Sequence, residues 1–229
     1  MRIRIAIAAA LSLGLFPTQR AIAADVGGGQ TNVVLDTALL SSAASLNLSS
    51  VSPDVISPGS LAGSVAFGIN SRTAATLPTT FAYNPATFPA GGSFSGTIEH
   101  QGSVFFNANA VEVGDFTIGF DGARAGTLGG AASGFYVAST TGIAAILFDL
   151  GVTSADPQPA TLDVGANLLV SPEFGSFLLA NGLSSTTLQG AAVGDALVEA
   201  TVVPEPAAAL LALFAIGAGT LGRRRGSVK

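Results

Sequence analysis

An alternation of apolar and polar side chains constrains the fold of this chain more than any other feature. In the segment 115–121, Phe116, Ile118 and Phe120 alternate with small or polar residues. Successive side chains of a β-strand point to opposite faces, so the segment predicts a strand with one buried face. Turn-forming Gly, Pro, Ser, Asn and Asp recur about every 8–12 residues, a spacing typical of all-β domains.

We therefore expect an all-β domain, an antiparallel β-sandwich or jelly-roll-like fold with one short helix. A parallel β-helix is the alternative, but the sequence has no regular short repeat. The segments 52–60 and 76–92 are rich in Pro, Gly, Ser and Thr and are expected to form long loops. The remaining predicted strands are 61–70, 94–100, 103–113, 135–138, 144–150, 161–164, 167–170 and 195–203.

The expected helix follows Ser171. Ser171 is a good N-cap, Pro172 suits the first helical position, and Glu173 places an acid in the first turn. Asn181 and the glycine after it would end the helix. The segment 36–46 fits either a second, weaker helix or a loose segment.

The first 23 residues have the composition of a secretory signal peptide (1–23). Two arginines lie within the first four residues, and an uncharged apolar run follows at 5–16. This run is too short for a confident membrane span. Ala21 and Ala23 are the small residues that a signal peptidase requires, so we expect cleavage after Ala23, with Ala24 as the second choice.

The C-terminal segment 204–229 has three parts in a fixed order. Pro204-Glu205-Pro206 is followed by the uncharged apolar run 207–222 and then by Arg223, Arg224 and Arg225. As a helix, the run would be roughly 24 Å long, a little short of the ~30 Å hydrocarbon core, and so a weak transmembrane anchor. The positive-inside rule keeps the arginines cytoplasmic and places everything before Pro204 outside the cytoplasm.

This ending resembles the PEP-CTERM sorting signal of Gram-negative bacteria. The resemblance covers residues 204–225, about a tenth of the chain. It implies recognition of Pro204, Glu205 and Pro206 by a membrane-embedded exosortase, which removes the tail. It also implies delivery to the cell surface or beyond, after an intermediate anchored in the inner membrane, and a link to exopolysaccharide and biofilm formation.

The composition of the segment 24–203 excludes several classes of function. Arg72 and Arg124 are its two basic residues, against 13 carboxylates, so its formal charge is −11. Nucleic acid binding needs clustered Lys and Arg and is excluded. The absence of cysteine excludes disulfides, thiolate metal sites and a cysteine nucleophile.

The chain contains no recognisable catalytic, cofactor or metal-binding motif. His100 is the one histidine, and strand parity places it inward while the adjacent Glu99 points outward, so the two are poorly placed to act as a pair. Asp115 and Asp121 lie at opposite ends of one predicted strand, too far apart to share a calcium ion. The four glutamates of the domain are candidate glycosidase carboxylates, but Glu112 and Glu199 are expected on solvated faces, and we predict no catalytic residue.

We therefore expect a non-enzymatic, exported protein of the cell surface or extracellular matrix. Signal peptidase and exosortase are its expected processing partners, and exopolysaccharide is a possible one. The alternatives are an enzyme acting on surface polysaccharide and a calcium- or glycan-binding adhesion module.

The signal sequence generates a direct prediction. Exported protein should begin at Ala24 or Asp25, because the small residues end at this point. N-terminal sequencing or peptide mapping of exported material tests the assignment. Exported protein that still carries Met1 would contradict it.

Overall fold

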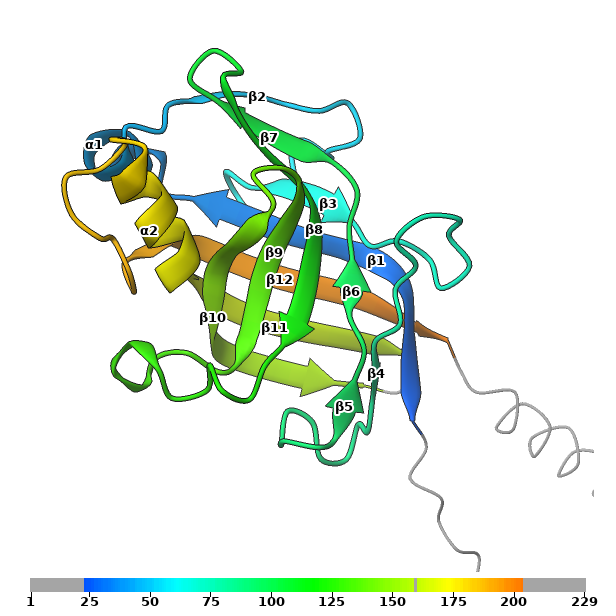
Figure 1. The fold of residues 1–229 in the computed structure, drawn as a ribbon. Coiled ribbons are helices and arrows are strands. Elements are labelled where there is room, and N and C mark those ends of the chain that lie inside the picture. The colour runs from blue at the N-terminus through cyan, green and yellow to red at the C-terminus, as the bar shows by residue number, and fades with distance from the viewer. Residues whose placement is uncertain (1–22, 159, 204–229) are drawn as a thin grey trace, which may run out of the picture.

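The computed structural model describes residues 23–158 and 160–203, and in this part the regular secondary structure is mostly β-strand (Figure 1). The all-β prediction is confirmed. The signal helix and the transmembrane helix predicted at the two ends lie outside the described residues. Within the described ranges, no helix has the length and apolar character that crossing a membrane would require. The strands are β1 Ala24–Leu35, β2 Leu48–Val51, β3 Val65–Gly68, β4 Ala82–Tyr83, β5 Phe94–Ser95, β6 Ile98–Glu99, β7 Ser103–Phe106, β8 Val111–Phe120, β9 Phe135–Gly142, β10 Ala145–Pro157, β11 Thr161–Val170 and β12 Ala192–Val203.

These strands form one antiparallel sheet in the order β2-β7-β8-β9-β10-β11-β12-β1-β4-β5, with β3 added to β1 and β6 added to β8. The sheet curls until its two halves meet. His100, which follows β6, forms a β-bridge with Ile69, which follows β3. The neighbouring Asn70 N–H donates to the Glu99 carbonyl at 2.7 Å. Backbone hydrogen bonds therefore join β8 back to β1 through short segments.

A single curled sheet replaces the two stacked sheets of the predicted sandwich. The long strands carry register shifts, for example between Val26 and Gly28 in β1 and between Val152 and Ser154 in β10. Such β-bulges bend a strand and increase its twist. The sheet can therefore fold over its own apolar face without breaking into two sheets.

Several predicted strands differ from the structure: 94–100 is divided into β5 and β6, and 61–70 is a strand only at β3. Two further differences have local reasons. The predicted strand 103–113 is a hairpin, with β7 and β8 joined by a turn in which Asn107, Ala108 and Asn109 have positive φ. Asn tolerates this conformation better than most residues, which makes the turn possible. The predicted strands 161–164 and 167–170 are one continuous strand, β11.

The strand β1 was not predicted at all, because its three consecutive glycines resemble a loop. In the structure they allow close approach of the neighbouring β12. A Cβ atom on Gly29, which has φ +113°, would lie 2.2 Å from the Glu199 carbonyl oxygen. A Cβ atom on Gly27 would lie 2.2 Å from a methyl group of Val203.

The helices α1 Thr37–Ala44 and α2 Pro172–Ala180 cover one end of the curled sheet (Figure 1). The predicted helix at 172–181 is confirmed, including its cap, where Ser171 Oγ accepts a hydrogen bond from the Phe174 N–H at 3.0 Å. The ambiguous segment 36–46 is helical and is capped by Asp36. Leu40 of α1 and Leu178 of α2 are buried against the sheet.

Aromatic side chains gather around the opposite end of the sheet. Phe94 is central among them, with ring centroids 4.8 Å from both Phe120 and Phe135. The Phe94–Phe120 contact is edge-to-face, at 83°, and such contacts add to the stabilisation from burial. Phe120, expected on the buried face with Phe116 and Ile118, remains 38% exposed because it ends its strand.

Arg124 ties α2 to the sheet. Its guanidinium forms two hydrogen bonds to the Asp149 carboxylate, at 2.6 and 3.1 Å, and two to the Glu173 carboxylate, both at 2.8 Å. Asp149 lies on β10 and is 1% exposed, whereas Glu173 is on α2 and partly exposed. Hydrogen bonds from Arg124 lower the pKa of Glu173 to about 2. Arg124 therefore neutralises a buried carboxylate and an exposed one together.

Replacing Arg124 with Met should destabilise the domain strongly. The change leaves Asp149 buried without its cation, a loss that typically costs about 3–5 kcal/mol. Urea denaturation monitored by circular dichroism measures the change in the free energy of unfolding.

The second arginine of the domain provides the matched control. Arg72 lies 3.6 Å from Asp25, and both side chains are about one-third exposed. Arg72→Met should cost about 1 kcal/mol or less, as exposed pairs usually do. Equal losses for the two variants would contradict the role assigned to Arg124.

Candidate functional site: paired chain ends and an apolar interior

The two predicted processing regions adjoin neighbouring positions of the sheet. Asp25 pairs with Val203, and Val26 with Val202, at the place where β1 begins and β12 ends. Ala23 is half-buried next to this pairing. The remaining predicted sorting residues, which are Ala21, Pro204, Glu205, Pro206, Arg223, Arg224 and Arg225, lie outside the described residues.

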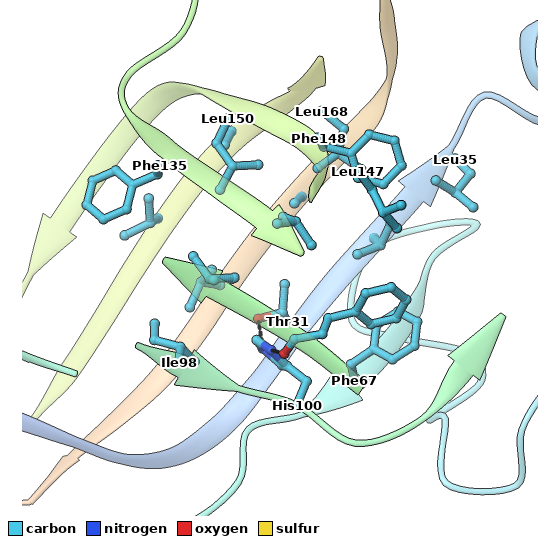
Figure 2. A pocket seen from close by; sticks show the side chains of 18 of the residues that line it. Thr31, Leu35, Phe67, Ile98, His100, Phe135, Leu147, Phe148, Leu150 and Leu168 are labelled. Carbon is cyan, nitrogen blue, oxygen red and sulfur yellow. Dashed lines mark hydrogen bonds between the residues drawn. The ribbon is translucent and has the colours of Figure 1, made fainter. Parts of the chain in front are cut away.

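The interior of the curled sheet encloses an apolar cavity of about 100 Å³ (Figure 2). Leucine, valine, isoleucine, phenylalanine and alanine side chains line it, from both halves of the sheet and from the helical end. Thr31 and His100 are the two lining residues with polar side chains. The chemistry of this cavity therefore depends on whether those two are free to bind anything.

The side chains of Thr31 and His100 form a hydrogen bond with each other. His100 Nδ1 lies 3.0 Å from the Phe116 carbonyl oxygen, which can accept only if this nitrogen carries the proton. His100 Nε2 then accepts the hydroxyl proton of Thr31, at 2.7 Å. Burial lowers the pKa of His100 to about 4, so the ring is neutral at pH 7. The prediction that His100 points inward is confirmed, and the pair leaves no unbonded nitrogen facing the cavity.

Glu99 lies on the opposite face of its strand from His100, as expected, but it is not solvated. It is 7% exposed and accepts a hydrogen bond from the Thr117 hydroxyl at 2.6 Å. Its backbone N–H donates to Thr79, which is 1% exposed. The segment that carries Thr79 covers this part of the outer face, which sequence parity alone does not reveal.

Glu199 lies at the centre of a second polar cluster on the outer face. It accepts hydrogen bonds from Ser60 and Asn32, both at 2.7 Å, and from Gln30 at 3.2 Å. The hydrogen bond from Ser60 is the main cause of a lowered pKa of Glu199. The predicted solvated face is thus partly covered by the loop that contains Ser60.

The other candidate carboxylates are held in separate local contacts. Glu112 accepts from Ser103 at 2.8 Å, Asp115 from Thr141 at 2.7 Å, and Asp121 from the Ala123 N–H at 2.9 Å. Among the residues that the structure describes, no three acidic or histidine side chains are grouped so that they could hold a metal ion.

Sequence reasoning missed the partner of His100 because Thr31 lies 69 residues away. No short motif encodes such a pair. The one available signal is strand parity, which places His100 on the same face as Ile98.

Comparison with protein-family models gives no match, and comparison with curated proteins gives none either. Among solved structures, the chain is similar to the C-terminal domain of HtaA from Corynebacterium glutamicum, with 15% sequence identity and a TM-score of 0.49. The similarity covers 79% of this chain and 99% of that domain. A similarity at this level carries no information about ligands or activity.

The buried histidine predicts a specific pH dependence. The pKa of His100 is about 4 in the folded state, below its usual value of 6.5. Between these two values, His100 is protonated in the unfolded chain but neutral in the folded chain. Stability is therefore lost as the pH falls from about 6.5 towards 4, by about 2 kcal/mol between pH 7 and pH 5. His100→Gln keeps a donor and an acceptor but removes the titration.

Chemical denaturation of both proteins at pH 7 and pH 5 measures this difference. The carboxylates are common to both proteins, so the extra loss in the wild type reports His100. Parallel stability changes in the two proteins would mean that His100 does not contribute.

Proposed function

We propose that this chain is an exported, non-enzymatic protein of the cell surface or extracellular matrix, sorted and C-terminally processed by an exosortase. One observation carries the proposal. The first strand begins at Ala24 and the last ends at Val203, so the described sheet occupies the interval between the two expected processing points. Cleavage after Ala23 and beyond Val203 would remove no part of a described strand.

The local structure at both boundaries supports this interpretation. Ala24 is 5% exposed and pairs with Tyr83, so the sheet begins at the expected new N-terminus. Val203 is 50% exposed, and strand pairing ends there. Pro204 follows, and proline has no amide proton to extend the pairing.

The carboxylates of the domain favour the non-enzymatic reading over the two alternatives. A glycosidase needs two carboxyl groups about 5–10 Å apart across a substrate cleft, and a calcium site needs several converging oxygens. Glu99, Glu112 and Glu199 each accept hydrogen bonds from different partners in separate clusters. Each of these three carboxylates therefore has a contact within the fold that accounts for its position.

The acidic surface fits an extracellular location. Both arginines of the domain form ion pairs with carboxylates, Arg72 with Asp25 and Arg124 with Asp149 and Glu173. The formal charge of −11 keeps the domain soluble and prevents it from binding other polyanions directly. Association with an acidic exopolysaccharide would therefore need bridging divalent cations.

Glu205→Ala tests the sorting proposal. The change should leave membrane insertion intact, because the apolar run and the three arginines are unaltered. It should impair processing, so that full-length protein accumulates in the membrane fraction. Immunoblots of membrane and medium fractions from the native host measure the distribution.

Asp156→Ala is the matched control, because Asp156 is also a carboxylate but lies at an exposed end of β10. It should leave processing unchanged. Neutral replacements of Arg223, Arg224 and Arg225 should instead loosen retention and release unprocessed chain. A plain membrane anchor predicts the same fractions for wild type and Glu205→Ala, and that result would refute sorting.

A further inference from the structure

Part of the wall of the cavity inside the curled sheet is built from small side chains. Val152, Ala166, Ala196 and Val33 are in register across β10, β11, β12 and β1. All four line the cavity. The row therefore crosses four neighbouring strands without one large side chain.

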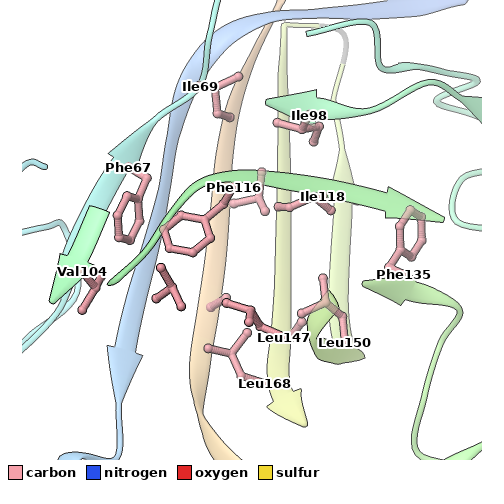
Figure 3. Packing of buried hydrophobic residues seen from close by; sticks show 14 of the residues in the cluster. Phe67, Ile69, Ile98, Val104, Phe116, Ile118, Phe135, Leu147, Leu150 and Leu168 are labelled. Carbon is pink, nitrogen blue, oxygen red and sulfur yellow. The ribbon is translucent and has the colours of Figure 1, made fainter. Parts of the chain in front are cut away.

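Larger side chains form the rest of the lining. Figure 3 shows Phe116 and Ile118 on β8, with Leu147, Leu150 and Leu168 from the facing strands. These side chains pack into one core but leave an unfilled space that Ala166 and Ala196 help to line. Protein interiors are normally packed as densely as organic crystals, so a space of about 100 Å³ is a departure from the rule.

Water is a poor occupant of this space. A buried water needs two to four polar partners, and apolar cavities of similar size stay dry. The Thr31 hydroxyl is bonded to His100, and the other nitrogen of His100 to the Phe116 carbonyl. The wall thus offers apolar contact and no unused donor.

We propose that the interior of the curled sheet is a binding site for a small, uncharged, apolar molecule. At about 100 Å³ the space is smaller than the ~150 Å³ cavity that accommodates benzene in another protein, so a single aromatic ring or a short hydrocarbon chain is the upper limit of ligand size. A charged ligand is excluded because nothing in the lining can compensate its desolvation. The ligand would contact side chains of the lining, among them Ala166, Ala196 and Phe116.

Binding of benzene and xenon to the processed, exported protein tests the site. Both probes should bind saturably and shift the methyl NMR signals of Ala166 and Ala196. Benzenesulfonate, which carries a charge on the same ring, should not bind. Locating the probe by these signals requires no variant.

Ala196→Leu should fill the space and reduce benzene affinity at least tenfold. Ala166→Val is a smaller change that keeps the test open if the first variant does not fold. Ala192→Leu is the matched control, because Ala192 is on the same strand but is exposed, and it should bind as the wild type does. Absence of saturable binding to the wild type, or unchanged binding to the filled variants, would overturn the proposal.

Discussion

The pairing of β1 with β12 is the contact on which the rest of the structure depends. It runs from Asp25 with Val203 to Leu35 with Gly194, with one register shift between Val26 and Gly28, and joins the first strand of the domain to the last. The chain has no cysteine, so no covalent link can hold these ends together. Backbone hydrogen bonds and the buried alternate side chains must do so, which explains why glycines replace larger residues where the two strands approach most closely.

Sequence patterns identified the elements whose cause is local. The alternation of Phe116 and Ile118 gave a correct strand, and Ser171-Pro172 gave a correct helix start, because neighbouring residues determine both. The strand β1 was not predicted, because its glycines make room for β12, which lies far along the chain. The single curled sheet was not predicted either, because its shape also depends on contacts between distant parts of the chain. Bulges decide whether a sheet bends or divides, and they depend on register between strands rather than on composition.

The same distinction applies to the interior. Parity along one strand predicted that His100 points inward, and burial confirms it. The Phe116 carbonyl that fixes its tautomer and the Thr31 hydroxyl that bonds its other nitrogen come from other strands, so no local pattern predicts them. On the outer face, strand parity predicts exposure for a residue that is buried. Glu99 has the parity of an exposed residue, but a loop that returns over the sheet brings Thr79 against it.

The pairing of β1 with β12 also determines when the sheet can be completed during synthesis. A ribosome makes β1 first and β12 last, and any secretory channel that passes the N-terminus first presents them in the same order. The edge of β1 that pairs with β12 therefore stays unpaired until nearly the whole domain has emerged. Contacts between residues so distant in sequence slow folding, and an unpaired strand edge attracts other chains meanwhile. Pairing of β12 with β1 is the last step, so the sheet can be completed only after residue 203 has emerged.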